Sequence, residues 1–335
     1  MTARSDANDR PRTSTPAAST EAARGGPVRY RLGYGKRRVP VYRVYAQPLS
    51  GIMPIPESDF TGRSNTLLAA EIDVEVFGDD FLAAYTEGDN SMVVATDSMK
   101  NFVLQQALAY EGATIEGFLA FLATDFTSTY EQLRSLRISA RELPLHPCQI
   151  AQAADSIESE VLYAESGTDV ATASVTVEGD AHGISVTDHH AGRAGMRLMK
   201  ITGSAFTSFV RDSYTTLPER RDRPLYLFLD VGWRYADVAD MIGFNHARYV
   251  PAEQVRDLIH TVFHEFVSES IQHLVHEIGQ RLLSRFPQLA EVSFAAQNRT
   301  RDPFYTSETD DRVRVYSDPF SAYGEITLTM TRSGV

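Results

Sequence analysis

The stretch EIDVEVFG at residues 71–78 alternates acidic and apolar side chains from Glu71 to Val76. This period of two is typical of a β-strand with one buried face. VPVYRVYA at 39–46 has a similar alternation, and residues 47–65 between the two stretches are rich in Pro, Gly and Ser. We therefore predict two strands joined by a long loop.

The period changes after MVVAT at residues 92–96, where small polar side chains follow the apolar ones. We predict a strand there and then a helix, because apolar residues recur at helical spacing from Met99 to Tyr110. A second helix is predicted over 114–133 and a strand over 136–145.

The second half of the chain follows the same order of strands and helices. This order predicts an α+β protein in which helices cover one face of antiparallel sheets. The predicted strands are 171–179, 195–203, 224–236, 289–298 and 324–332, and the predicted helices are 251–266 and 268–286.

Composition disfavours several classes of protein. The net charge is −12, so the chain repels nucleic acid and anionic membrane surfaces at long range. No stretch approaches the ~20 apolar residues of a membrane span. The single cysteine, Cys148, cannot form an internal disulfide, and we predict a cytoplasmic protein. Residues 1–28 offer almost nothing to bury and are predicted to be a disordered tail.

Thr96 and Asp97 stand where a helix is predicted to begin. Either side chain could cap that helix by accepting hydrogen bonds from free backbone N–H groups. Taken alone, capping is the favoured interpretation. The N-terminus of a helix also attracts anions, so the same residues are compatible with an anionic ligand.

Two pairs of histidines at helical spacing raise the question of a metal site. His260 and His264 are four residues apart, and His273 and His276 are three apart. The first pair lacks the HExxH arrangement, and both helices are amphipathic, so solvated or interface positions are favoured over metal ligation. TDHHAG at 187–192 is predicted to be a loop.

Several long motifs, in the same sequence order, resemble urate oxidase, the cofactor-free uricase family. The motifs are YGKRRVPVYRV (34–44), YTEGDNSMVVATDSMKN (85–101), residues 199–223, residues 249–298 and YGEITLTMTR (323–332). The stretch 249–298 is most similar to the bacterial members. The resemblance spans nearly everything after the tail.

The resemblance implies a tunnelling fold (T-fold). Each chain would hold two tandem units of antiparallel sheet with helices on one face, predicted here over residues 29–160 and 161–335. Sheets from different subunits would join into a barrel. A homotetramer with active sites at the subunit interfaces is expected.

The resemblance also implies site residues. Lys36 and Thr96 match the catalytic pair, with Asp97 beside them. The remaining matches are Phe206 as the aromatic on which the purine stacks, Arg223 and Gln272 as the two clamps, Ile271 as an apolar backbone contact and Asn298 as the amide above the ring.

The implied reaction converts urate, dioxygen and water to 5-hydroxyisourate and hydrogen peroxide, in purine degradation, without a metal or an organic cofactor. A lysine partly desolvated by an interface loses its proton more readily and could draw one from Thr96. One position departs from the family pattern: Thr300 stands where many members have a histidine that extends the proton relay, and Arg299 precedes it.

Two alternatives remain open at this point. The changed relay position is compatible with a purine-binding assembly that has lost catalysis. The helical histidines are compatible with a metal-dependent purine or pterin hydrolase, since tunnelling folds also host such enzymes.

Overall fold

The main body of the protein is one eight-stranded antiparallel sheet. The computed structural model describes residues 28–152, 155–180, 183–299, 302–317 and 322–334. The strand order is β1-β2-β3-β6-β7-β8-β9-β12, so β1 and β12 form the two edges of the described sheet. The strands are β1 Gly33–Val44, β2 Leu67–Phe77, β3 Ser135–Glu142, β6 Val170–Asp180, β7 Gly183–Lys200, β8 Leu225–Tyr235, β9 Leu289–Asn298 and β12 Gly324–Thr331.

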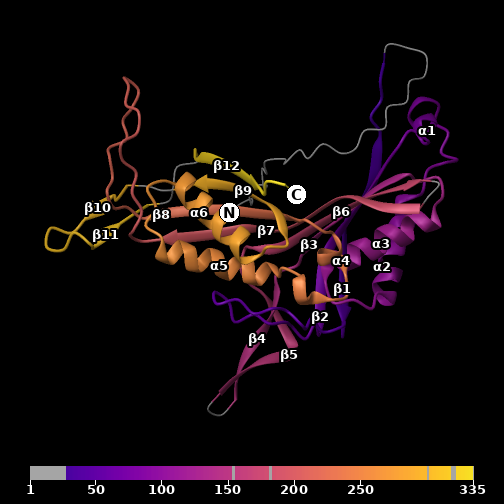
Figure 1. The fold of residues 1–335 in the computed structure, drawn as a ribbon, viewed down its shortest axis with the longest axis horizontal. Helices are drawn as coiled ribbons and strands as arrows, with labels where there is room; N and C mark the ends of the chain where they lie inside the picture. Colours follow the sequence, from indigo (N-terminus) through magenta and orange to yellow (C-terminus); the bar gives the residue numbers. More distant parts are fainter. Residues whose placement is uncertain (1–27, 153–154, 181–182, 300–301, 318–321, 335) are drawn as a thin grey trace, which may run out of the picture.

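Four long helices cover one face of this sheet (Figure 1). Helices α2 and α3 pack against β1, β3 and β6, whereas α5 and α6 pack against β7, β9 and β12. The chain thus runs through two strands, a helix pair and two strands, and then repeats this order, which confirms the predicted α+β arrangement. The helices are α2 Thr96–Ala109, α3 Ile115–Thr129, α5 Ala252–Glu265 and α6 Ile271–Arg285, with short α1 Leu82–Thr86, α4 Ala239–Ile242 and the 3-10 helix η1 His246–Arg248 in the connections.

The two faces of the sheet differ in chemistry, as the alternation at 71–78 predicts. Ile72, Val74 and Val76 of β2 are fully buried beneath the helices. Their neighbours point to the uncovered face, where Arg37 donates to Asp73 and Glu75 at 3.1 and 2.7 Å. The helix-covered face supplies the apolar core, and the other face is polar.

Two hairpins lie outside the main sheet. Strands β4 (Leu145–Gln152) and β5 (Asp155–Glu165) pair only with each other and form an arm that leaves the body, at the bottom of Figure 1. Strands β10 (Tyr305–Thr306) and β11 (Arg314–Val315) form a smaller hairpin at the left. The arm was missed by the sequence prediction, because its residues are mostly exposed and show no buried face.

The prediction of a loop at 187–192 is wrong, because these residues lie inside the long strand β7. Residues of the neighbouring strand β8 bind the polar side chains of this stretch. The Nε2 atom of His189 accepts a hydrogen bond from the backbone N–H of Tyr235 at 3.1 Å, and Asp188 forms an ion pair with Arg234. These contacts with β8 let β7 carry polar side chains at 188 and 189.

The prediction of a strand at 92–96 is also wrong. Residues 91–95 are turn and irregular backbone, and α2 begins at Thr96. The backbone N–H of Val94 donates to the hydroxyl of Tyr34 at 2.8 Å. A side chain of β1 thus holds this segment, which makes no strand pairing of its own.

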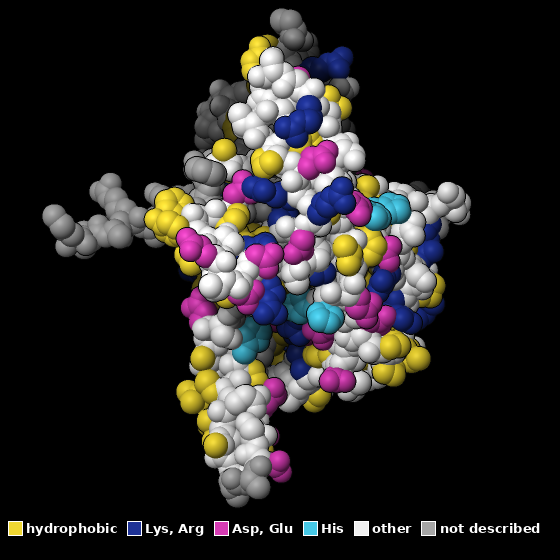
Figure 2. Space-filling model, turned by 90° about the vertical axis from the view of Figure 1, so that its left-hand side faces the viewer, with side chains coloured by type: hydrophobic (Ala, Val, Ile, Leu, Met, Phe, Trp, Pro, Cys, Tyr) yellow, Lys and Arg dark blue, Asp and Glu magenta, His cyan; other side chains and the backbone are white. Residues whose placement is uncertain are grey.

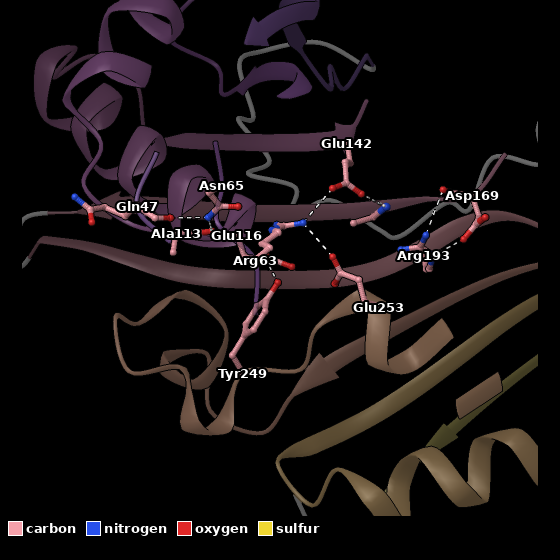
Figure 3. A network of polar contacts seen from close by, with 11 residues as sticks. Gln47, Arg63, Asn65, Ala113, Glu116, Glu142, Asp169, Arg193, Tyr249 and Glu253 are labelled. Atoms are coloured by element: carbon pink, nitrogen blue, oxygen red, sulfur yellow. Dashed lines mark hydrogen bonds and ion pairs between the residues drawn. The ribbon is translucent and has the colours of Figure 1, made fainter. Parts of the chain in front are cut away.

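A partly buried polar network joins the two halves of the chain (Figure 3). Arg63, in the loop after β1, donates to Glu142 of β3 at 3.2 Å and to Glu253 of α5 at 3.1 Å. The hydroxyl of Tyr249 donates to Glu116 of α3 at 3.0 Å. Burial raises the pKa of Glu116 to about 7, so its carboxyl changes charge near neutrality.

Candidate active site

The residues that match the catalytic pair lie close together in the first half of the chain. Lys36 is on edge strand β1, and Thr96 is the first residue of α2. The Tyr34–Val94 hydrogen bond joins the two segments two residues before each of them. Strand β1 also shifts register between Lys36 and Val39, a bulge that re-aims side chains at this point.

Asp97 completes this set, which we call the relay group (Lys36, Thr96 and Asp97). Its carboxylate accepts from Lys100 at 2.7 Å and from Asn101 at 3.0 Å. The hydrogen bond from Lys100 contributes most to lowering the pKa of Asp97, and the positive charge of Lys36 adds to the effect. Asp97 is therefore an exposed carboxylate that stays ionised, with Lys36 near enough to act on it.

The capping interpretation of Thr96 and Asp97 is wrong. The N-cap of α2 is Ala95, and no side chain makes a cap hydrogen bond there. Thr96 and Asp97 lie inside the first turn of the helix instead. Their side chains are thus not used to satisfy the start of α2.

The other predicted site residues lie in the second half, and we call them the clamp group (Phe206, Arg223, Ile271, Gln272 and Asn298). The Phe206 segment is held through its backbone. Phe206 exchanges hydrogen bonds with Arg220 at 2.8 and 3.0 Å, and the N–H of Arg223 donates to the carbonyl of Ser204 at 2.8 Å. These backbone hydrogen bonds thus fix the position of the Arg223 backbone relative to Phe206.

Arg223 is a buried cation beside an aromatic ring. It is only 9% exposed, and its guanidinium lies 5.2 Å from the centre of the Phe206 ring. Burial lowers the pKa of Arg223. Its buried Nε has no hydrogen-bond partner among the described residues. A buried donor without a partner requires an explanation, and a bound ligand supplies one.

The N-terminus of α6 forms the opposite side of the clamp group. Ile271 is its first residue and is buried, whereas the side chain of Gln272 is exposed. The hydroxyl of Ser270 caps the helix by accepting from the N–H of His273 at 3.1 Å. The remaining free N–H groups and the helix dipole favour a negative charge here.

Asn298 ends β9, where it lies opposite Leu227 of β8 and Gly324 of β12. The next residue, Arg299, donates to Gln297 at 2.7 Å and lies 3.8 Å from the centre of the Tyr323 ring. The Arg299 side chain is therefore engaged by its neighbours on the sheet. Thr300, the position that departs from the family pattern, lies outside the described residues.

The structure brings each group together but keeps the two groups apart. The relay group lies at edge strand β1, and Asn298 lies on β9, six strand spacings away in the sheet order. Six spacings correspond to about 29 Å along a sheet. Figure 1 shows β1 and α2 at the right of the molecule and β9, α6 and the start of β8 toward the left. The residues that the resemblance assigns to one site therefore fall into two separate groups, each a candidate half-site.

Comparison with known proteins adds the family. Residues 33–175 and 189–327 match the uricase family. The chain belongs to this family. The uricase of Haloferax volcanii is 47% identical over 271 residues, which cover 80% of this chain and 88% of the relative. The uric acid degradation bifunctional protein of Bacillus sp. (strain TB-90) is 41% identical over 89% of this chain, which spans only 60% of that longer protein.

Solved structures of this family have the same fold. The urate oxidase of Bacillus sp. TB-90 superposes with a TM-score of 0.87 at 40% identity, covering 90% of this chain and 100% of that one. A uricase from Bacillus fastidious gives a TM-score of 0.87 at 42% identity. The mixed architecture of antiparallel sheet and few helices is therefore that of the uricase family.

The sequence interpretation missed three residues that hold the site. Lys100 pairs with Asp97, as described above. Phe209 stacks on Phe206, with ring centres 4.9 Å apart and planes 12° apart, so one face of Phe206 is covered. Asp222 accepts from the hydroxyl of Thr202 at 2.9 Å and from the N–H of Gly203 at 2.8 Å. For Asp222, the only sequence signal was its position next to Arg223.

The face at the left of Figure 1 is shown in Figure 2, where cationic, acidic and histidine side chains are interspersed. No large region of that face carries a single sign of charge. Within the described ranges, no group of three or more His, Cys, Asp or Glu residues is arranged to hold a metal ion. No described helix is long and apolar enough to cross a membrane.

Proposed function

We propose that this uricase-family chain is a factor-independent urate oxidase, which converts urate, dioxygen and water to 5-hydroxyisourate and hydrogen peroxide. One observation carries the proposal. The buried Arg223 offers an unpartnered Nε beside the Phe206 ring, in the half-site that also contains the N-terminus of α6. This arrangement suits a flat anion with oxygen atoms along its edge.

Binding would use contacts of three kinds. The guanidinium of Arg223 can donate two parallel hydrogen bonds to one edge of the purine, and the carboxamide of Gln272 can grip the other edge. Phe206 would stack on the flat face. The N–H groups at the start of α6 would add attraction for the negative charge. Together these contacts fix the ring in one plane.

Catalysis would begin with proton removal. A lysine desolvated by an interface can give up its proton, draw one from Thr96 and so let the threonine take one from urate. The electron-rich purine then transfers two electrons to dioxygen, and water adds its oxygen to the ring. The two electrons and two protons leave as hydrogen peroxide, so the equation balances without a cofactor. Asn298 would hold dioxygen and then water above the ring, and Thr300 would stand next in the relay.

We further propose that the working site lies between two copies of the chain, in a homotetramer with a T-fold. Two facts support this. The relay and clamp groups lie too far apart in one chain to hold one purine, and the described sheet ends in two unpaired edges, β1 and β12. Pairing β12 of one copy with β1 of another would close a barrel and remove both edges.

The tandem division of the chain also remains a proposal. The order of two strands, two helices and two strands occurs twice, which supports two T-fold units. The predicted boundary after residue 160 falls inside β5 of the arm. The single cysteine suits a reducing compartment, and we place the enzyme in the cytoplasm.

An assay on chelator-treated protein tests the activity. The protein should bleach the near-ultraviolet absorbance of urate, consume dioxygen and release hydrogen peroxide. Tight urate binding without oxygen consumption would instead indicate a purine-binding assembly. Activity that returns only when a metal is added would indicate a hydrolase or another metal enzyme.

Mixing two impaired variants, at a urate concentration well below the Kd of Arg223→Ala, tests the shared site. Thr96→Ala damages the relay group and Arg223→Ala damages the clamp group. When the two variants are refolded together, random pairing should leave about a quarter of the sites with neither change. Activity should then reappear at about that fraction of the wild-type value. No recovery in assemblies shown to be mixed would mean that each site is built from one chain.

A further inference from the structure

Lysine is scarce in this chain, and its positions are not scattered. Of 32 Lys and Arg residues only three are lysines: Lys36, Lys100 and Lys200. Lys36 belongs to the relay group and Lys100 pairs with Asp97. A chain that otherwise uses arginine retains lysine where a compact ammonium on a flexible stem differs from a planar guanidinium. Lys200 therefore invites a closer look.

Lys200 ends strand β7 and holds the C-terminal end of helix α5. Its Nζ donates to the carbonyl of His264 at 3.2 Å and to that of Phe266 at 3.0 Å. Carbonyls at a helix C-terminus lack partners within the helix, and the dipole there favours a cation. Gly203 packs closely against the Lys200 side chain, because a Cβ at Gly203 would lie 3.0 Å from Cε of Lys200.

This contact lies at the join between the two sides of the clamp group. Ser204 pairs with Ser268 in a short parallel bridge, and the N–H of Ala205 donates to the carbonyl of Ser268 at 2.8 Å. Both serines are 2% exposed. Phe206 follows directly in one segment and Gln272 follows four residues after Ser268 in the other. Lys200 thus ties together the two segments that present the stacking ring and the carboxamide.

We propose that Lys200 is a positioning residue, which sets the spacing between Phe206 and Gln272 by tying the end of β7 to the last turn of α5. It does not contact the purine. It fixes the width of the clamp, and so the length of the ligand edge that fits between Arg223 and Gln272. The consequence for urate rests on the proposed function, whereas the effect on the join does not.

The chain offers a matched control. Arg332 also donates to backbone carbonyls at the C-terminal end of a helix. Its partners are Leu283, in the last turns of α6, and Leu289, just after α6, at 2.6 Å. Arg332→Met therefore removes a cation of the same kind at the far end of α6, away from Gln272. Any general loss of stability from removing such a cation should appear in both variants.

The experiment compares Lys200→Met, Lys200→Arg and Arg332→Met in the full-length assembled protein. Hydrogen exchange of the peptides over residues 201–206 and 264–270 should quicken about tenfold in Lys200→Met and stay unchanged in Arg332→Met. Anaerobic titration with urate should show a Kd about tenfold weaker for Lys200→Met, while kcat at saturating urate changes less than about threefold. Lys200→Arg should weaken binding about fivefold, because the larger guanidinium does not fit beside Gly203.

The readouts separate the two proposals. If the wild type does not bind or oxidise urate, the proposed function fails, and the exchange data still decide the role of Lys200. Unchanged exchange in Lys200→Met would overturn that role. So would equal weakening of urate binding in Arg332→Met, or wild-type binding in Lys200→Arg.

Discussion

The relay group and the clamp group are built in opposite ways. Arg223 is 9% exposed and Ile271 is 2% exposed, and backbone hydrogen bonds hold their segments. The side chain of Asp97 is 73% exposed and is held by neighbours on its own helix. The chain thus fixes the clamp group in advance and leaves Asp97 of the relay group open to solvent.

This difference teaches where assembly would matter. Hydrogen bonds and charges acquire their full strength only when water is excluded. Arg223 and Ile271 of the clamp group are already buried, so we expect this group to affect affinity. In the assembly proposed above a second copy would cover the relay group and exclude water from it, so we expect this group to affect the rate. The following experiments test this division, starting with the largest expected effect.

Thr96→Ala should separate rate from affinity most strongly. Loss of the proton relay is expected to lower kcat by about 10²- to 10⁴-fold. The anaerobic Kd for urate should change less than about threefold. Thr129→Ala, which removes an exposed hydroxyl that bonds within α3, serves as the control. A large loss of affinity in Thr96→Ala would place this residue with the clamp.

The polar network that contains Arg63 and Glu116 joins the two halves of the chain and should make the stability of the protein depend on pH. The pKa of Glu116 is raised from 4.5 to about 7, so the folded protein holds this proton more tightly than the unfolded chain. Stability is therefore full below the unfolded pKa and is lost as the pH rises to about 7. The loss is about 3 kcal/mol.

Urea denaturation at a fixed protein concentration, between about pH 5 and about pH 8, measures this dependence. Glu116→Gln keeps a hydrogen-bonding group in place and should flatten the curve. A variant whose stability follows the same pH slope as the wild type would show that another group titrates.

Arg223→Ala should act on binding. Hydrogen bonds to a charged group contribute about 1.5–3 kcal/mol, so Kd for urate should rise by about 10- to 100-fold. Arg223→Lys should fall between the two, since lysine lacks the planar fork. Arg221→Ala, an exposed neighbour, is the control and should bind urate as the wild type does. If Arg221→Ala were as weak as Arg223→Ala, net charge would explain the effect.

Asp97→Asn should give the smallest effect. Asp97 is exposed and its pKa is lowered by Lys100, so it stays ionised across the working pH range. Screening by water limits its influence, and kcat/KM should change by about two- to fivefold. The acid limb of the pH–rate profile should not move. A shift of that limb would assign the titration to Asp97.

Much of the fold could be read from hydrophobic period alone. The alternation at 71–78 and the spacing from Met99 onward predict β2 and α2, because one face of each is buried in the apolar core. Strand β7 could not be predicted at 187–192, since its polar side chains are bound by residues of the distant strand β8. The conformation of residues 92–96 could not be predicted either, because it depends on the distant hydroxyl of Tyr34.

The site was predictable only in part. The family resemblance assigns Lys36, Thr96, Arg223 and the others to the site, but motifs along a chain do not show which residues meet. The separation of the relay and clamp groups comes from the strand order. The unpartnered Nε of Arg223 is likewise a property of the packed structure. The role of Lys200 had one available signal in the sequence, which was the rarity of its residue type.

That rarity has a practical consequence for labelling. Amine-reactive reagents usually modify sites over the whole surface of a protein, because exposed lysines are abundant. Here every side-chain amine belongs to the relay group, contacts Asp97 or ties the clamp together. Coupling dyes, polymers or a solid support through lysine would therefore target the catalytic region first.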